Sequence, residues 1–281
     1  MSTGTRLTPE EICFFKREGY LVKRGVMDPD LMAQARAFLW EGAPPRMRRD
    51  DPNTWVGPFR PDEEDEDPEN QRRGFTWKYR EPAQKALLND MLAADPTIWG
   101  WAEQLLGKGE VSRPPRIRGI YCKLPMGAHP EEPTLFHVDV LIPLTPRLGL
   151  VGIISPIPPR GGAFTVWPKS HRSFYKAVAK PEVTQEVADS PSRREQVAGY
   201  KDAVAHFRQQ PYVECCGEAG DIFFWHHLLA HTAGHNRSEQ LQVRQAVLCD
   251  YVKKTDERTL GELPHEDIWH DWSEEVRAVS V

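Results

Sequence analysis

The sequence predicts an α+β protein with a mainly β core, because two different patterns follow one another along the chain. In the N-terminal part, three segments have the apolar spacing of amphipathic helices and are flanked by recognisable end signals. From residue 117 onward, short apolar runs are separated by glycine and proline turns. Short strands of this kind are typical of a sandwich or a barrel. No boundary is visible between residues 1 and 281, so we expect a single domain.

The helices are predicted from their ends as well as from their apolar faces. Residues 8–11, Thr-Pro-Glu-Glu, combine an N-cap, a proline at the first helical position and a capping-box glutamate. Gly19 is expected to end this helix before a strand at 20–22. A second helix is expected to start at Asp28, and a third to run over residues 83–106.

The β part is predicted as strands joined by turns and one insertion. The expected strands are 117–124, 135–142, 148–155, 163–167, 221–225 and 241–252. Residues 180–209 are expected to form a polar helical insertion. Residues 42–74 contain an acidic run at 61–69, where like charges repel and prolines interrupt a helix, so we expect a mobile surface loop. This loop is either a lid over an active site or a solvated insertion.

The composition excludes several classes of protein. With 27% charged residues and a formal net charge of −5, the chain is unlike the basic proteins that bind nucleic acids. No apolar stretch approaches the roughly 20 residues of a membrane span, and the N-terminus does not resemble a secretory signal. Five irregularly spaced cysteines do not predict a disulfide framework. We therefore expect a cytoplasmic protein without a nucleic-acid or membrane partner.

The most informative motif is His137-Val138-Asp139. Residues two apart on a strand point to the same face, so the imidazole and the carboxylate can both project into a barrel. The apolar neighbours in 135–142 predict a buried strand, where a carboxylate needs a cation or several hydrogen-bond donors. A second histidine, His231, follows another apolar run. Two imidazoles and one carboxylate are the ligands of mononuclear non-haem iron(II) sites that keep open positions.

An arginine completes this pattern. Arg244 follows His231, and the alternation of apolar residues around it places it in the middle of a predicted strand. A buried guanidinium there can bind a dicarboxylate through two parallel hydrogen bonds. A structural pair with Asp221 or Asp250 is the alternative. Iron together with a clamped 2-oxo acid is suited to oxygen activation.

Four blocks stand in an order that points to a known family. They are the opening helix and strand at 7–26, the motif at 137–139, the glycine-rich segment 161–171, and a distal block with Gly220, Asp221, His231, Asn236 and Arg244. In these blocks the sequence resembles the phytanoyl-CoA dioxygenase family of iron(II)/2-oxoglutarate oxygenases, and the resemblance runs over most of the chain. The third block is similar to the family's segment ending in Pro-Gly-Ser-His, with Lys169 in place of the usual glycine.

The resemblance implies a double-stranded β-helix, or jelly roll, flanked by the N-terminal helices. It implies iron(II) held by His137, Asp139 and His231, 2-oxoglutarate clamped by Arg244, and O2 as the second co-substrate. The implied reaction is hydroxylation at an unactivated C–H bond with release of succinate and CO2. Related halogenases carry a small residue where this chain has Asp139, so we expect hydroxylation rather than halogenation.

The third metal ligand has alternatives. Four histidines lie close together in the sequence: His226, His227, His231 and His235. The family's spacing between ligand and clamp fits His231 with Arg244, and it would pair His227 with Arg237. Because Arg237 lies in a turn-like segment, we favour the first pair. His226 and His235 are expected to be partly exposed loop residues.

Further contacts to the co-substrate are expected from position alone. Lys123 and Tyr121 lie on the strand before the metal motif, where the family often places a hydrogen bond to 2-oxoglutarate, and Thr165 is a similar candidate on another strand. Some relatives use a serine two residues beyond the distal histidine. Ala233 stands at that place here, so the contact is missing or is supplied by Thr232.

The substrate is expected to be a small, polar or anionic molecule. Trp167, Lys169, His171 and Arg172 follow a glycine pair and are expected near the mouth of the barrel, where they either contact the substrate or brace a loop. His227 either supports the metal site or faces the substrate. Two other functions are considered: a cupin-like metal-dependent isomerase or hydrolase, which needs no arginine clamp and no O2, and a non-catalytic metal-binding sensor on the same scaffold.

Overall fold

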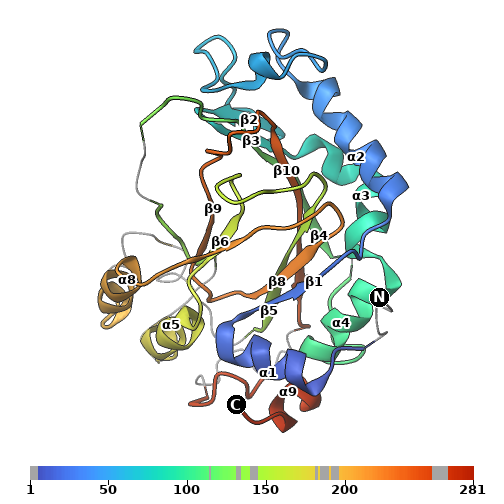
Figure 1. Cartoon of the computed structure of the whole chain (residues 1–281). Helices are drawn as coiled ribbons and strands as arrows, with labels where there is room; N and C mark the ends of the chain where they lie inside the picture. The colour runs from blue at the N-terminus through green and yellow to red at the C-terminus, as the bar shows by residue number, and fades with distance from the viewer. Residues whose placement is uncertain are drawn as a thin grey trace.

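Two antiparallel β-sheets face each other at the centre of the molecule (Figure 1). The larger sheet has the strand order β1-β8-β5-β10-β4-β3-β2, and the smaller sheet has the order β7-β6-β9. This computed structural model describes residues 6–113, 115–130, 134–139, 145–180, 183, 190, 196–254 and 265–281. The arrangement is the mainly β, jelly-roll core that the sequence predicts.

The strands of the larger sheet are β1 (Tyr20–Lys23), β8 (Ile222–His226), β5 (Arg147–Ile153), β10 (Arg244–Val252), β4 (Arg116–Lys123), β3 (Thr76–Tyr79) and β2 (Asn70–Arg73). Those of the smaller sheet are β7 (Val213–Cys215), β6 (Phe164–Val166) and β9 (His231–Ala233). The helices are α1 (Pro9–Glu18), α2 (Pro29–Gly42), α3 (Ala86–Leu88), α4 (Pro96–Leu106), α5 (Ser170–Val178), α8 (Tyr200–Arg208) and α9 (Glu274–Ala278). Shorter turns are η1 (Pro52–Trp55), η2 (Glu81–Gln84) and the π-helix η3 (Asn89–Ala93).

The N-terminal helices cover the outer face of the larger sheet (Figure 1). Phe15, Leu39 and Trp101 are fully buried there in one cluster with strand residues such as Phe224. Burying a side chain of this size stabilises a fold by roughly 1.5–3 kcal/mol. Among the described residues, none of the helices is long and apolar enough to span a bilayer.

The ends of α1 are as predicted, whereas the helix predicted over 83–106 is interrupted. At α1, the Thr8 hydroxyl accepts from the Glu11 N–H and the Glu11 carboxylate accepts from the Thr8 N–H. In the later segment, η3 ends at Ala93, and α4 begins anew with Asp95 as its N-cap. Because proline lacks an N–H and disfavours helix in the residue before it, the pair Asp95-Pro96 starts a helix and cannot lie inside one.

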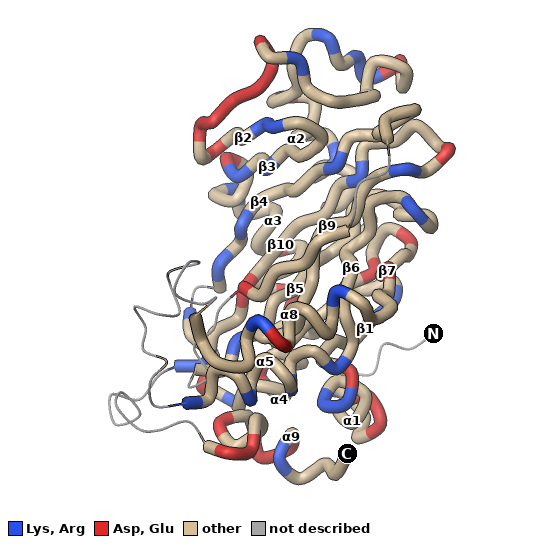
Figure 2. The backbone as a smooth tube through the Cα atoms, turned by 90° about the vertical axis from the view of Figure 1, so that its left-hand side faces the viewer, with Lys and Arg blue, Asp and Glu red and all other residues tan. Residues whose placement is uncertain are grey.

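The segment 42–74 contains more regular structure than the predicted surface loop. It holds η1 and β2, and β2 pairs with β3 at the edge of the larger sheet. The acidic run lies alongside β2 (Figure 2). Within it, Glu63 is buried and accepts hydrogen bonds from Arg46 Nε at 2.8 and 3.1 Å. This pair ties the run to the chain just beyond α2, and the mobility of the run and its role as a lid remain predictions.

The predicted helical insertion at 180–209 is described in part. Its described residues contain α8, while 181–182, 184–189 and 191–195 lie outside the described part of the chain. Helix α8 packs against α5, with the rings of Phe207 and Phe174 6.2 Å apart between centroids. Lys169, which precedes α5, has φ 70° and ψ −7°. This left-handed conformation suits glycine and explains why glycine is usual at this place in the family that the sequence resembles.

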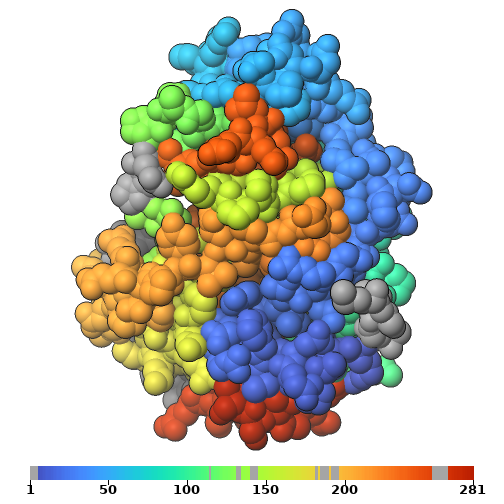
Figure 3. Space-filling model, in the orientation of Figure 1, coloured from blue at the N-terminus to red at the C-terminus, as the bar shows by residue number. Residues whose placement is uncertain are grey.

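The C-terminal segment 265–281 packs against α1 (Figure 3). Lys16 is buried between them, and its Nζ donates to the carbonyl oxygens of Val276 and Val279 at 2.8 and 2.5 Å. The amine therefore pairs with carbonyls near the end of α9, where a positive charge also interacts favourably with the helix dipole.

The strand predicted at 135–142 is wrong over its described part. Residues 134–139 form only one bridge, in which His137 pairs with His231 of β9, and residues 140–142 lie outside the described residues. The other five predicted strands match β4, β5, β6, β8 and β10. The strands β2, β3, β7 and β9 were not predicted, because they are short and rich in polar residues.

Candidate active site

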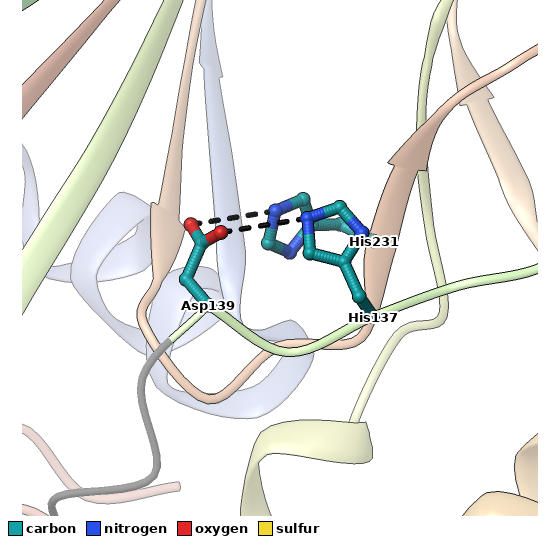
Figure 4. A group of neighbouring side chains, drawn as sticks. All are labelled: His137, Asp139 and His231. Atoms are coloured by element: carbon teal, nitrogen blue, oxygen red, sulfur yellow. Dashed lines mark ion pairs between the residues drawn. The ribbon is translucent and has the colours of Figure 1, made fainter. Parts of the chain in front are cut away.

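His137, Asp139 and His231 meet between the two sheets. Each offers one ligand atom, and these atoms lie within 4.8 Å of one another. The carboxylate of Asp139 faces both rings from one side (Figure 4): its Oδ1 is 3.4 Å from His137 Nε2, and its Oδ2 is 3.5 Å from His231 Nε2. Donor atoms at this spacing can all reach one metal ion, and the set is that of a 2-His-1-carboxylate iron(II) site.

The bridge between His137 and His231 places the two rings side by side. The N–H of each residue donates to the carbonyl oxygen of the other at 3.0 Å, and the ring centroids are 4.5 Å apart. His231 Nδ1 lies 2.8 Å from the carbonyl oxygen of Leu229. Because a carbonyl can only accept, Nδ1 carries the proton and Nε2 keeps its lone pair for a metal.

Arg118 of β4 holds the carboxylate of Asp139, and sequence analysis missed it. Its Nη2 lies 3.2 Å from Asp139 Oδ2, and its Nε donates to Asp250 Oδ2 at 2.6 Å. Burial alone raises the pKa of Asp139, but interactions with His231, His137 and Arg118 outweigh burial and hold this pKa well below the usual range. The Asp139 carboxylate is therefore ionised and can bind a metal ion. The available signal was a charged residue between Ile117 and Ile120 in a strand.

The three ligands line a cavity of about 590 Å³, which we call the barrel cavity. Its wall also includes Arg244, Lys123 and Tyr121. Arg244 is 2% exposed, its Nη1 donates to the carbonyl oxygen of Tyr121 at 3.2 Å, and its Nε has no hydrogen-bond partner in the described part of the chain. Burial lowers the pKa of Arg244 to about 10, so the guanidinium is still charged at neutral pH.

The carboxylates that were the alternative partners of Arg244 are engaged elsewhere. Asp221 Oδ2 lies 2.6 Å from Arg24 Nη1, and Asp250 binds Arg118. Arg244 makes no ion pair with any described carboxylate. A buried cation with an unused donor is costly unless an anion joins it, so this side chain fits the far carboxylate of 2-oxoglutarate.

Lys123 and Tyr121 lie on β4 beside Arg244, and their hydrogen bonds to 2-oxoglutarate remain predictions. Lys123 is opposite Arg244 in the β4–β10 register, and its Nζ donates to Thr76 Oγ1 at 2.8 Å. Burial, with further contributions from Arg244 and Lys78, lowers the pKa of Lys123 to about 8. Both side chains line the barrel cavity and can contact a co-substrate that Arg244 holds.

Thr165 does not line this cavity. Its hydroxyl donates to the carbonyl oxygen of Ala163 at 3.1 Å, and its neighbour Phe164 lines the cavity instead, since successive strand residues point to opposite faces. Thr232 and Ala233 of β9 also line it. Thr232 is therefore better placed than Thr165 for a hydrogen bond to the co-substrate.

Trp167, His171 and Arg172 do not lie at the mouth of the barrel cavity. His171 is fully buried, with Nε2 3.1 Å from the carbonyl oxygen of Lys16, and Arg172 Nη2 donates to the same oxygen at 3.1 Å. Trp167 is buried against Phe136, with ring centroids 4.8 Å apart. These contacts correspond to the bracing alternative: they tie α5 to α1 and support the segment that carries His137.

The other histidines and Arg237 take different places. His226 is fully buried in β8 and stacks on Trp272, so its expected exposure is wrong. His227 lines a second cavity beside the metal site. The Arg237 guanidinium donates to the carbonyl oxygens of His129 and Pro130 and does not line the barrel cavity. Of the two arginines, Arg244 is therefore the one that is placed to bind a co-substrate in the barrel cavity.

Comparison with known families agrees with this geometry. Residues 15–246 match the family model described as phytanoyl-CoA dioxygenase (PhyH). The chain belongs to the PhyH family. The protein is accordingly a 2-oxoglutarate-dependent dioxygenase, with iron(II) and 2-oxoglutarate as its cofactors. No curated protein matches the sequence.

Solved structures with the same fold share low sequence identity with this PhyH chain. EctD from S. alaskensis with bound Fe is 18% identical, with a TM-score of 0.55 over 90% of this chain and 79% of that chain. The carbocyclase SnoK from nogalamycin biosynthesis is 18% identical, with a TM-score of 0.53 over 93% and 95%. HygX from Streptomyces hygroscopicus with nickel and 2-oxoglutarate is 16% identical, with a TM-score of 0.52 over 89% and 88%.

Proposed function

We propose that this PhyH dioxygenase hydroxylates an unactivated C–H bond of a small molecule that carries an acidic group. The observation that carries the proposal is an intact three-ligand site in a cavity of mainly positive charge. Asp139 is the only carboxylate among the described residues of its wall, beside the cations Arg73, Lys78, Arg118, Lys123 and Arg244. The two negative charges of a bound 2-oxoglutarate are balanced by the positive charges of Arg244 and Lys123. The positive charges of Lys78 and Arg73 are then left to attract an anionic substrate.

Different residues of the cavity would bind the metal, orient the co-substrate and exclude water. His137, Asp139 and His231 would hold iron(II), which supplies oxygen activation when it is bound together with 2-oxoglutarate. Arg244 would orient the co-substrate through its far carboxylate. The aromatic rings of Phe164 and Trp225 line the same cavity. They exclude water from the bound co-substrate and lower the local dielectric, which strengthens the contact to Arg244.

Asp139 favours hydroxylation over halogenation. Its carboxylate fills the ligand position that the related halogenases leave open for chloride, and Arg118 holds it there. Two solved relatives of the same fold support a small polar substrate. EctD is solved with 2-oxoglutarate and 5-hydroxyectoine, at a TM-score of 0.54, and HygX with hygromycin B, at 0.51.

The test is a substrate screen. The ferrous protein is mixed with 2-oxoglutarate, O2, chloride and a panel of acidic, neutral and acyl-thioester compounds, and succinate formation and product masses are measured. We expect substrate-dependent succinate and a product heavier by one oxygen atom for an acidic member of the panel. A chlorinated product would contradict hydroxylation, and turnover confined to long-chain acyl thioesters would contradict the small acidic substrate. Oxygen uptake that does not require 2-oxoglutarate would favour a different metal chemistry.

A further inference from the structure

We propose that a second cavity beside the metal site binds the acidic group of the substrate. This arginine cavity has a volume of about 450 Å³, and its charged lining residues are four arginines and three carboxylates: Arg80, Arg116, Arg118, Arg147, Glu69, Asp139 and Asp250. The inference rests on the proposed function, because it names the place where the substrate of that function binds.

The arginine cavity adjoins the barrel cavity at the metal ligand. Arg118, Tyr121 and Asp139 line both cavities, whereas Arg244 and Lys123 line the barrel cavity alone. A molecule in the arginine cavity therefore comes close to the carboxylate ligand without competing for the co-substrate clamp. This is the arrangement that a reaction with two organic substrates needs.

The guanidinium of Arg147, at the start of β5, forms no ion pair with a described residue and can therefore bind an anion in this cavity. Its Nε is buried, and among the described residues that atom has no hydrogen-bond partner. Arg118, in contrast, is engaged by Asp250 and Asp139. A buried donor without a partner costs free energy, and an anion in the cavity removes that cost.

The remaining arginines leave the cavity with an excess of positive charge. No ion pair or side-chain hydrogen bond joins Arg116 to another described residue, and its side chain is exposed at the cavity wall. Arg80 Nε donates to the Tyr121 hydroxyl at 3.4 Å, and its Nη1 donates to the carbonyl oxygen of Pro68. Among the described lining residues, Glu69 is the one acidic residue that Arg118 does not bind, and it is exposed.

These features fit one carboxylate, phosphate or phosphonate group. The planar guanidinium of Arg147 can bind any of these groups through two parallel hydrogen bonds, and Arg116 can bind from the open side. His227 also lines this cavity, and its Nδ1 accepts from the backbone N–H of Arg147 at 3.4 Å. The volume lies near the lower end of roughly 300–1,000 Å³ that is usual for ligand pockets, so the substrate is a small acid.

The experiment measures anion binding directly. Ferrous protein, saturated with 2-oxoglutarate under anaerobic conditions, is titrated with methylphosphonate and with propionate at constant ionic strength, and heat is recorded by calorimetry. The variants are Arg147→Gln and Arg116→Gln. Arg113→Gln is the matched control, because Arg113 lies over the Trp99 ring outside both cavities. Affinity for iron and for 2-oxoglutarate is measured in the same preparations.

We expect at least one probe to bind the wild type. Its dissociation constant should rise about tenfold or more in Arg147→Gln, since a charge-assisted hydrogen bond is lost, and it should rise in Arg116→Gln. The control should bind as the wild type does, and 2-oxoglutarate affinity should change less than twofold. Tighter binding of methylphosphonate assigns a phosphate-like group, and tighter binding of propionate assigns a carboxylate.

Several outcomes separate this inference from the proposed function. If neither probe binds, or if both cavity variants bind like the wild type, the arginine cavity is not the anion site even where iron and 2-oxoglutarate bind normally. If the probe binds through Arg147 while 2-oxoglutarate does not bind at all, the anion site stands and the proposed function fails. Should Arg147→Gln not fold, Arg116→Gln, which changes an exposed side chain, decides the question alone.

Discussion

Arg118 and Asp139 form a charged pair at the edge of the metal site. The Arg118 guanidinium lies 3.2 Å from the Asp139 carboxylate and also binds Asp250 of the neighbouring strand β10. Asp139 is thus anchored through Arg118 to two strands of the larger sheet, β4 and β10. Such outer contacts orient a ligand and limit the ways in which it can turn.

We expect Arg118→Gln to weaken metal binding. Removing the guanidinium frees Asp139 to rotate and leaves Asp250 without its partner, so affinity should fall by roughly 10–100-fold. Cobalt(II) titration followed by visible absorption measures this affinity. The matched control is Arg116→Gln, two residues earlier on β4, which does not touch Asp139. Equal affinities in all three proteins would show that Arg118 has no positioning role.

Alanine variants test the ligand assignment. His137→Ala, Asp139→Ala and His231→Ala should each abolish iron(II) binding and turnover, because each removes one donor of the three. His227→Ala should retain iron, since that ring lines the arginine cavity. Metal content after anaerobic loading and gel filtration measures the outcome. Iron lost from His227→Ala and kept by His231→Ala would reverse the assignment.

Changes at Arg244 test the co-substrate clamp. Losing a buried charge-assisted pair costs on the order of 2–5 kcal/mol, so Arg244→Ala should weaken 2-oxoglutarate binding by tens-fold or more. Arg244→Lys keeps the positive charge but loses the two parallel hydrogen bonds of the guanidinium, so its affinity for 2-oxoglutarate should lie between those of the wild type and Arg244→Ala. Arg237→Ala is the control, because that side chain binds backbone carbonyls outside the cavity. Unchanged 2-oxoglutarate dependence in Arg244→Ala would refute the clamp.

The convergence of His137, Asp139 and His231 could be predicted from the sequence, but the backbone that carries them could not. The spacing of His137 and Asp139 suggested a strand, whereas the structure has one bridge to β9 there. The ligands still converge, because that bridge fixes His137 and Arg118 holds Asp139. Arg118 was missed because an arginine between isoleucines looks like an ordinary exposed strand residue, and its partners are distant in the sequence.

For the residues predicted to contact the substrate, the local turn was predicted correctly but their position in the fold was not. His171 and Arg172 follow a glycine-rich turn, which suggested the cavity mouth, but the left-handed turn at Lys169 directs α5 toward α1. Turn chemistry is visible in a sequence, while the direction of the next helix depends on what that helix packs against. Arg147 had no local signal in the sequence, since its place in the cavity wall depends on residues of other strands and loops.

Lys169→Gly should stabilise the protein. A left-handed backbone costs roughly 1–2 kcal/mol for an L residue with a side chain, and the entropy that glycine gains in the unfolded chain offsets part of this, so we expect a gain of about 0.5–1 kcal/mol. Urea unfolding measures the free energy. The control, Lys176→Gly on the exposed face of α5, should destabilise by up to about 1 kcal/mol. The same sign for both variants would contradict this explanation.

Acid should unfold the protein partly through His171. Burial lowers the pKa of His171 to about 3, and the nearby charges of Arg172 and His227 act in the same direction. The unfolded chain binds the proton more readily, so stability is complete above pH 6.5 and is lost as pH falls toward 3, by up to about 1.4 kcal/mol per pH unit.

Urea midpoints across this pH range test the effect. His171→Gln should flatten the slope, although buried His226, whose pKa is also lowered by burial, keeps part of it. His206→Gln, a change on the exposed face of α8, should leave the slope unchanged. A slope that is identical in His171→Gln and the wild type would exclude this histidine as a source of acid sensitivity.

Because a backbone bridge joins His137 to His231, a metal ion bound by both side chains would also stabilise the fold. Two backbone hydrogen bonds, each worth about 1 kcal/mol, join the segment 134–139 to β9. A metal ion bound by the side chains of His137 and His231 would connect the same two segments a second time. At a free metal concentration of 100 times its dissociation constant, this adds about 2.7 kcal/mol to the stability of the folded chain. Loss of iron would therefore weaken the attachment of the segment 134–139 to β9 as well as stop the reaction.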